Sequence, residues 1–424
     1  MNRTSRIALR LIIIFLIPVA AFAQHEPVTN STSIQEGLNL FENGLYSEAS
    51  AQFAKAIAEH QGDVQEEELA AYYYVRSQSR LDSSRIGQLT DEYVQSYPKS
   101  RYASVLLKDE ADQYKRRGNL DMAIYHMQEA INYPQSTSRK ARLYYMIAET
   151  AAENGQNDLA RETFLELSDN FRRSEWSPKA LYARGRLYLS DEQYEEASEA
   201  FELLRERHPF DPMTRRIGTA LGESYYQQRR YTEAIEALER ALSILDEENA
   251  SKAVYLIAES YNALNDYENA TRYYRQYINR VENEEQERIA HYGLGWVYHK
   301  QEIYHWAADA FGRAATGNDA VARKGLYYEA VNNKLAGRYQ KALDAFREFG
   351  QRFQDGEFFE QAYYEWAVAA FEVGFYGEAI EALLPLARDL ENLDQPGRTL
   401  TFLGEVYFAN AEYTRALETF QLAE

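Results

Sequence analysis

The chain alternates short apolar and polar blocks in a pattern that recurs every 35 to 37 residues along almost its whole length. Clear copies are QYEEASEAF from residue 193, RYTEAIEAL from 230, DYENATRYY from 266, RYQKALDAF from 338 and FYGEAIEAL from 375. In each copy an alanine is followed four residues later by a large apolar side chain. Because positions i and i+4 share one face of an α-helix, the pattern predicts helices.

Two small residues mark each copy. The recurring alanines are Ala49, Ala123, Ala160, Ala197, Ala234, Ala270, Ala307, Ala342, Ala379 and Ala416, with Ile86 at the place between the first two. Twelve residues before each alanine stand Gly37, Ala111, Ala148, Gly185, Gly222, Ala258, Gly295, Ala330, Ala367 and Gly404. Small residues on both helices allow a close approach, so each copy reads as a hairpin of two helices, A and B.

A hairpin of this kind would expose an apolar face on its own, so the copies are expected to stack on one another. Eleven copies fit between residue 30 and Glu424. The sequence therefore predicts an all-α fold, an α-solenoid of about eleven helical hairpins over residues 34–424. The second hairpin, about 67–100, is degenerate, and residues 24–33 are expected to be a flexible N-terminal segment.

Residues 1–23 have a different character. Arg3, Arg6 and Arg10 precede the apolar run of residues 11–17, and residues 21–23 read Ala-Phe-Ala. This order predicts a secretory signal peptide cleaved after Ala23, and so export to a bacterial periplasm or cell envelope. The alternative is an uncleaved membrane anchor, although the apolar segment is interrupted by Pro18 and is shorter than the roughly 20 residues that cross a bilayer.

Charge and cysteine content narrow the range of partners. The formal net charge is −20, and the leader carries three arginines and no acids, so its removal gives −23. Such a surface repels nucleic acid, which we do not expect as a partner. The chain contains no cysteine, so it can carry neither a disulfide nor a cysteine-linked lipid.

The pattern of a small residue, eleven others, alanine, three others and an aromatic residue resembles the tetratricopeptide repeat. Leu-Gly pairs such as Leu221-Gly222 and Leu294-Gly295 and the tyrosines three residues before the alanine belong to the same resemblance. It implies a right-handed superhelix whose helices A line a concave surface. It also implies a protein that binds other proteins and catalyses no reaction.

The boundary SYPKSRYAS (residues 96–104) resembles the turns between repeats in exported bacterial tetratricopeptide proteins. These include the lipoprotein of outer-membrane β-barrel assembly and the coordinator of the Tol–Pal system. The first of these families has a lipid-bearing cysteine, which this chain lacks, and both are shorter than eleven repeats.

No constellation of residues points to catalysis. His291 and His299 would lie eight residues apart on one helix, about 12 Å along its axis, which is too far for a shared zinc ion; His305 lies across the next turn. Gly293-x-Gly295 lacks the third glycine of a dinucleotide loop and falls inside an expected helix. We therefore expect no catalytic residue, no metal site, no cofactor and no enzyme activity.

The resemblance implies that the second, fifth and ninth places of each repeat face the concave surface. The second place holds a cation in six repeats: Arg142, Lys179, Arg216, Lys252, Lys324 and Arg398. The fifth holds Tyr145, Tyr182, Tyr255, Tyr292, Tyr327 and Tyr364. The ninth holds Glu149, Glu223, Glu259 and Glu405, but Trp296 in the eighth repeat. These cations, tyrosines and Trp296 are the candidate ligand-binding residues.

A second interpretation of the cations is local. Four of them have a tyrosine three residues later and could lie over its ring. A cation in the first turn of a helix opposes the helix dipole, however, and its repetition in six repeats favours a functional row.

The expected function is a non-catalytic scaffold that binds an extended, acidic peptide or protein segment along this surface. The alternative is binding of a cell-wall glycan through stacked tyrosines. After removal of the leader no transmembrane segment is expected. Self-association is possible through Leu417, Phe420 and Leu422, because the last repeat has no polar capping helix in this sequence.

Overall fold

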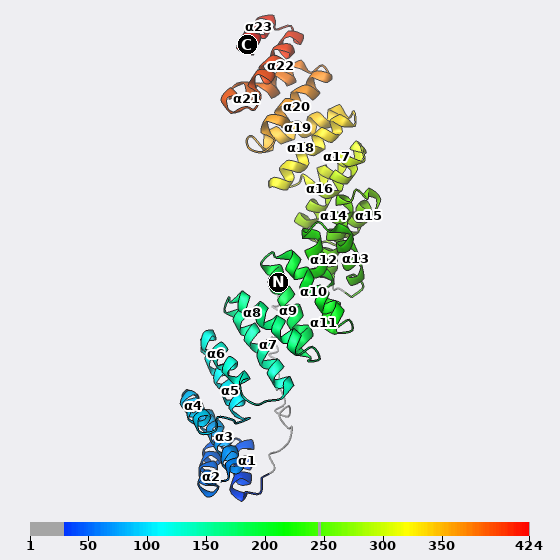
Figure 1. Ribbon diagram of the computed structural model, residues 1–424. Coiled ribbons are helices and arrows are strands. Elements are labelled where there is room, and N and C mark those ends of the chain that lie inside the picture. Colours follow the sequence, from blue (N-terminus) through cyan, green and yellow to red (C-terminus); the bar gives the residue numbers. More distant parts are fainter. Residues whose placement is uncertain (1–28, 245–246, 424) are drawn as a thin grey trace, which may run out of the picture. The chain divides into compact units, whose positions relative to one another are not determined.

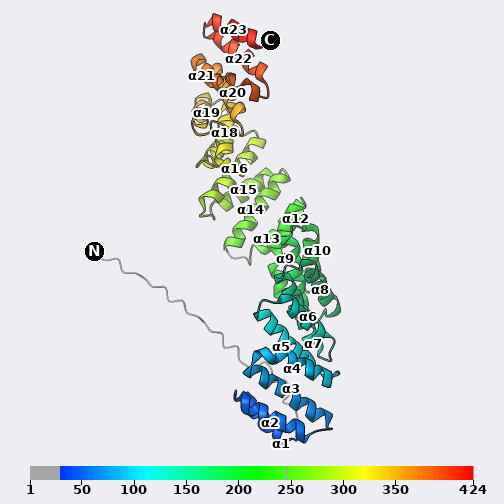
Figure 2. The ribbon, with the colours of Figure 1, turned by 90° about the vertical axis from the view of Figure 1, so that its left-hand side faces the viewer.

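A computed structural model describes residues 29–244 and 247–423, and these contain helices and no strand. The all-helical class predicted from the sequence is confirmed. The chain divides into two compact parts, which we call the N-terminal part, up to Thr163, and the C-terminal part, from Phe164. Within each part the helices follow one another in chain order, each hairpin beside the next (Figures 1 and 2).

The helices form the eleven expected hairpins. The first four are α1 (Thr32–Glu42) with α2 (Tyr46–Glu59), α3 (Val64–Leu81) with α4 (Ile86–Ser96), α5 (Ala103–Arg116) with α6 (Leu120–Ile131), and α7 (Thr137–Glu153) with α8 (Asn157–Asn170). In the second hairpin a short 3₁₀ helix, η2 (Ser83–Arg85), stands between the two α-helices. Helix α8 spans the boundary between the two parts.

The C-terminal part continues the series. Its hairpins are α9 (Trp176–Ser190) with α10 (Tyr194–Arg207), α12 (Gly218–Gln227) with α13 (Tyr231–Ala241), α14 (Glu247–Ala263) with α15 (Tyr267–Ile278), α16 (Glu284–Lys300) with α17 (Tyr304–Ala314), α18 (Ala320–Leu335) with α19 (Tyr339–Arg352), α20 (Phe359–Glu372) with α21 (Tyr376–Ala387), and α22 (Pro396–Ala409) with α23 (Tyr413–Ala423). Two short helices, α11 (Pro212–Arg216) and η3 (Leu390–Asn392), precede α12 and α22.

The small residue of helix A lies directly beneath the large residue of helix B in the same hairpin. A Cβ atom built on Gly295 would be 2.7 Å from the ring of Phe311, and one on Gly185 would be 2.5 Å from Phe201. Both rings are fully buried. The glycines are thus packing residues, because any side chain at these positions would enter the space that the ring occupies.

In every hairpin except the second, the turn between helices A and B contains one residue with left-handed backbone, five residues before the recurring alanine. It is a glycine in hairpins 1, 3, 4, 9 and 10, and a residue with a side chain in hairpins 5, 6, 7, 8 and 11: Glu192, Arg229, Asn265, Glu302 and Ala411. In hairpin 11 the Ala411 N–H donates to Phe408 O at 3.0 Å and the Glu412 N–H to Tyr407 O at 2.9 Å. This pair of bonds is a Schellman motif, which closes α22 and requires a positive φ.

Ala411→Gly is therefore expected to stabilise the last hairpin by about 0.5–1 kcal/mol, because Ala411 is exposed and has a φ of +62°. Hydrogen exchange of the α23 amides measures this local stability. Ala409→Gly, which lies within α22, is the matched control and should destabilise the hairpin. Equal effects at the two positions would contradict the assignment of the motif.

Ion pairs connect consecutive hairpins of the C-terminal part. Arg347 on α19 donates to Glu378 on α21 through Nε at 2.8 Å and Nη2 at 2.7 Å. Lys334 on α18 pairs with Glu365 on α20. The two partners of each pair are 31 residues apart, a little less than one repeat.

Two predictions concern the ends of the chain. No helix in residues 29–244 and 247–423 has the length and apolar character needed to cross a bilayer. The predicted signal peptide lies outside these residues.

On α23, Leu417 and Leu422 are 61% and 71% exposed. Phe420 is instead half-buried over Gly404: a Cβ atom built on Gly404 would lie 2.6 Å from its ring, so Phe420 is not part of an exposed face.

Candidate interaction surface

Five of the six candidate cations lie on a helix A, as predicted. Arg142 is on α7 in the N-terminal part, and Lys179, Lys252, Lys324 and Arg398 are on α9, α14, α18 and α22 in the C-terminal part. Arg216 does not follow the prediction. It is the last residue of the short helix α11, and Ile217 separates it from α12, so Arg216 and Glu223 do not share one continuous helix.

Two of the candidate cations pair with carboxylates of neighbouring hairpins. Lys252 Nζ lies 2.8 Å from Glu223 Oε2, and Lys324 Nζ lies 3.5 Å from Glu357 Oε1. The row of cations is therefore partly neutralised. Sequence reasoning missed these pairs because it compared only residues within one helix.

Two other cations lie over aromatic rings. Lys179 Nζ is 4.1 Å from the ring centroid of Trp176, three residues earlier in the chain, and not over Tyr182. The guanidinium of Arg398 lies 4.2 Å from the ring of Tyr364, on the preceding hairpin, and its Nε donates to the Tyr364 hydroxyl at 3.1 Å. For Lys179 the local interpretation named the right kind of contact and a different ring; for Arg398 it made no prediction.

The six candidate tyrosines are all half-buried. Tyr327 is stacked on Phe358 at 4.4 Å between centroids, and burial raises the pKa of its hydroxyl to about 12. Burial also raises the pKa of Tyr145 and Tyr255, with neighbouring Glu149 and Glu259 adding to the effect. These rings thus belong in part to the packing between helices.

Trp296 is the centre of an aromatic cluster in hairpins 8 and 9. Its ring lies 4.6 Å from Tyr328, 5.7 Å from Phe311 and 6.3 Å from Tyr292. Phe311 is buried and the other three rings are half-buried. Trp296 occupies the ninth place of its repeat, where other repeats have a glutamate, and so adds a large ring to the row of tyrosines.

The histidines and glycines of α16 have structural surroundings. His291 is buried 3.5 Å from the carboxylate of Glu287, and His299 Nδ1 is 2.8 Å from Asn332 Oδ1. In the described part of the chain no group of three or more histidine or acidic side chains is placed to hold a metal ion. A Cβ on Gly293 would be 2.6 Å from the hydroxyl of Tyr274, so this glycine packs against the preceding hairpin.

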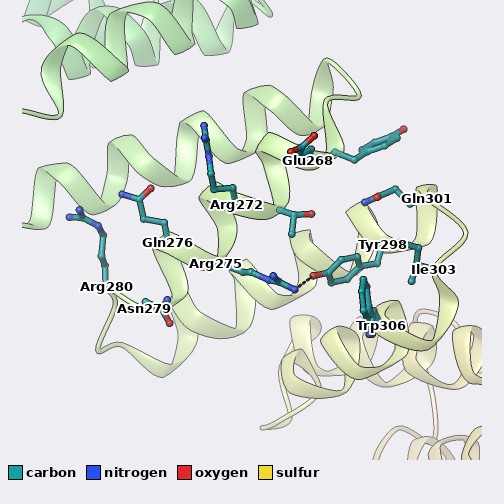
Figure 3. Close-up of a pocket in the computed structure, with 12 residues that line it drawn as sticks. Glu268, Arg272, Arg275, Gln276, Asn279, Arg280, Tyr298, Gln301, Ile303 and Trp306 are labelled. Atoms are coloured by element: carbon teal, nitrogen blue, oxygen red, sulfur yellow. Dashed lines mark hydrogen bonds between the residues drawn. The ribbon is translucent and has the colours of Figure 1, made fainter.

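A pocket of about 780 Å³ lies on the helix-B side of hairpins 7 and 8 (Figure 3). Its lining residues are Tyr267, Glu268, Thr271, Arg272, Arg275, Gln276, Asn279 and Arg280 of α15 and the residues just after it, and Tyr298, Gln301, Ile303 and Trp306 of hairpin 8. None of these is a candidate from the sequence. The sequence does hold a sign of this pocket: polar residues on α15 recur every three or four positions and so share one face of the helix.

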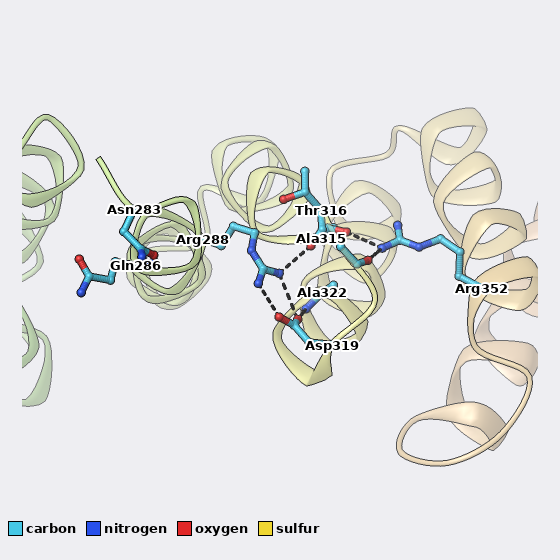
Figure 4. A network of polar contacts seen from close by, with 9 residues as sticks. Asn283, Gln286, Arg288, Ala315, Thr316, Asp319, Ala322 and Arg352 are labelled. Carbon is cyan, nitrogen blue, oxygen red and sulfur yellow. Dashed lines mark hydrogen bonds and ion pairs between the residues drawn. The ribbon is translucent and has the colours of Figure 1, made fainter. Parts of the chain in front are cut away.

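A polar network holds the turn between hairpins 8 and 9 (Figure 4). The guanidinium of Arg288 donates to Thr316 O at 2.6 Å and to both carboxylate oxygens of Asp319, the N-cap of α18. Arg352 donates to the carbonyls of Ala315, at 2.7 Å, and Gly317. The hydrogen bonds from Arg288 and from the Ala322 amide lower the pKa of Asp319 to about 2. The network therefore stabilises the connection between hairpins 8 and 9.

A profile of the tetratricopeptide repeat family matches residues 145–212, 182–253 and 219–284. The matched segments contain the pair of Gly185 and Phe201. Residues 145–284 are tetratricopeptide repeats. Helical hairpins with the same packing continue on both sides of this range, in Gly37 against Phe53 and in Gly404 against Phe420. The tetratricopeptide fold is in general a non-catalytic scaffold for binding proteins.

Solved structures of tetratricopeptide proteins are similar to this chain. One is a tetratricopeptide repeat protein from Parabacteroides merdae, 20% identical over 58% of this chain and 91% of its own, with a TM-score of 0.38. Another, from Cytophaga hutchinsonii, is 14% identical over 74% of this chain and 98% of its own, with a TM-score of 0.41. The quorum sensor NprR from B. thuringiensis is 14% identical over 75% and 96%, with a TM-score of 0.37. A comparison with curated protein sequences finds no match.

Proposed function

We propose that this tetratricopeptide protein is a non-catalytic scaffold of the bacterial periplasm or cell envelope. It binds an extended peptide or protein segment along the helices A of its C-terminal part. The basic and apolar order of residues 1–23 supports export. The repeat supports a protein partner, because stacked hairpins present long, repetitive surfaces for binding.

The observation that carries the binding surface is the series of half-buried aromatic rings on consecutive helices A. Tyr255, Tyr292, Tyr327 and Tyr364 stand on α14, α16, α18 and α20, one in each hairpin. Trp296 and its neighbours widen the series on α16 and α18. Rings that are fixed by packing on one side lose little conformational entropy when a ligand covers the other, which favours them as contacts for apolar side chains.

Charges beside the rings define the rest of the ligand. Lys252, Lys324 and Arg398 lie next to the aromatic series, and the first two are paired with Glu223 and Glu357. Each pair is open to solvent on at least one member, so a ligand carboxylate can share the cation. The proposed ligand therefore carries carboxylates between apolar side chains. A uniformly acidic segment is less favoured, because two of the cations are already paired with carboxylates of the chain.

The glycan alternative has less support on this surface. A sugar ring stacks on the open face of an aromatic ring, but Phe358 lies against the face of Tyr327 and Arg398 against that of Tyr364. The surface fits a peptide better, because apolar side chains can contact ring edges.

Lys252→Gln is expected to weaken capture of the native partner at least tenfold, about 1.4 kcal/mol, because it removes a cation from the binding surface. The measurement is recovery of proteins from envelope extract of the source organism by the tagged chain, followed by titration of the captured protein.

Glu223→Gln is the matched control, because it breaks the same 2.8 Å ion pair and leaves the cation in place. If the pair is only structural, the two variants will lose stability alike and bind alike. Binding that is unchanged in Lys252→Gln, or equally weakened in both variants, contradicts the proposal.

A further inference from the structure

The pocket of hairpins 7 and 8 is separate from the helix-A surface. Its walls are one face of α15, a helix B, and the end of α16 with the start of α17 (Figure 3). The lining residues Glu268, Arg272 and Arg275 of α15 and its C-cap residue Asn279 recur at intervals of three or four. They therefore form one continuous stripe along the helix.

The floor of the pocket carries an exposed indole. Trp306 on α17 is 48% exposed, and its ring packs edge-on against Tyr298, with 5.5 Å between centroids. Tyr298 is itself buried. An indole that is held by a buried ring and open to solvent offers a rigid apolar contact, the kind of anchor that dominates binding energy at protein interfaces.

The pocket is positive within a strongly acidic chain. Arg272, Arg275 and Arg280 line it, against Glu268 as the one carboxylate among the lining residues. Arg272 and Arg275 are exposed and pair with no carboxylate in the described part of the chain, whereas Arg347 and Lys334 of hairpin 9 are paired.

Arg275 is already oriented for an anion. Its Nη2 donates to the hydroxyl of Tyr298 at 2.8 Å (Figure 3), and the ring of Tyr298 packs against the indole of Trp306. A guanidinium has five N–H donors in a fixed fork, so most of them are left for a bidentate carboxylate.

We infer that this pocket is a second binding site, which takes an acidic peptide segment with an aromatic or aliphatic side chain. The carboxylates lie at Arg272 and Arg275, and the apolar side chain lies on Trp306. The formal charge of −20 does not prevent this, because charges farther than about 8 Å are largely screened at physiological salt and the local arginines decide. The amides of Gln276, Asn279 and Gln301 provide partners for the peptide backbone.

A purely structural explanation of the arginines exists and can be distinguished. Arg275 is in the last turn of α15, where a cation stabilises the helix dipole. In that case its replacement lowers the stability of the hairpin and leaves peptide binding unchanged. If the arginine binds the peptide, its replacement weakens peptide binding and leaves the stability of the hairpin nearly unchanged.

The test is an array of immobilised octapeptides, varied at every position and probed with the full chain. The expected result is selection of peptides that combine aspartate or glutamate with an aromatic or aliphatic residue. In solution, the affinity for the best such peptide should fall at least tenfold in Arg272→Gln/Arg275→Gln and in Trp306→Ala, and should weaken with added salt.

Arg313→Gln is the matched control, an exposed arginine of α17 outside the pocket, and should bind like the wild type. Lys252→Gln should also bind like the wild type, so failure here is distinguishable from failure of the helix-A surface. Absence of acidic peptides among those selected, unchanged affinity in the pocket variants, or binding of a neutral oligosaccharide at Trp306 in place of the peptide would overturn the inference.

Discussion

Phe311→Ala is expected to lower the free energy of unfolding by about 3–5 kcal/mol, because a fully buried ring leaves a cavity that its neighbours fill only in part. Phe311 has no exposed surface and contacts the rings of Tyr292, Trp296 and Tyr328. Urea unfolding followed by circular dichroism measures the effect. Phe210→Ala, the same change at a ring that is 91% exposed, is the control and should cost less than about 0.5 kcal/mol.

The pair of Gly295 and Phe311 gives an internal check on this result. Gly295→Ala alone should destabilise by about 1–3 kcal/mol, because its Cβ would lie 2.7 Å from the ring. In the Phe311→Ala background the same change should cost much less, since the ring is gone. Additive effects would show that the two residues do not share the interface as described.

Glu110→Gln is expected to change how stability depends on pH. Glu110 on α5 is buried, 3.4 Å from His126 on α6, and burial together with the charge of Asp91 raises its pKa to about 7. The folded chain therefore keeps a proton up to about pH 7 that the unfolded chain releases near 4.5. This contribution to stability is complete below pH 4.5 and is lost as the pH rises through 7.

Glutamine has no proton to lose. The free energy of unfolding of the variant should therefore rise relative to that of the wild type as the pH rises from 4.5 to 7, by about 3 kcal/mol at most. His126, whose pKa is lowered by burial, lies 3.4 Å from Glu110, so the difference between the two chains reports the titration of this pair. Urea midpoints of the two chains across this pH range provide the measurement. A constant difference would show that Glu110 titrates alike in both states.

The repeated core could be predicted from the sequence, because a fixed spacing between a small and a large residue leaves few ways to pack two helices. Gly185 and Phe201, or Gly295 and Phe311, meet as that spacing requires. The left-handed turns could not be predicted by residue type, since glycine holds that place in some hairpins and Glu192 or Arg229 in others.

The candidate surface was predicted less completely. The helix-A positions of Lys252 and Tyr255 follow from periodicity along one helix. The partner of Lys252 is Glu223, 29 residues away, and depends on how one hairpin rests on the next. The pocket at Trp306 likewise depends on the approach of two hairpins, which no pattern within one repeat describes.

The ion pairs between adjacent hairpins have a consequence for how such a chain can change in length. Arg347 with Glu378 and Lys334 with Glu365 each join a hairpin to the one after it, and to none farther along. Excision or duplication of one whole repeat would bring together two surfaces of the same kind as those it separated. A cut within a repeat would instead leave a buried ring without its packing partner and a charged side chain without its ion pair. The period of 35 to 37 residues is therefore also the length by which this protein can be extended or shortened without losing its interfaces.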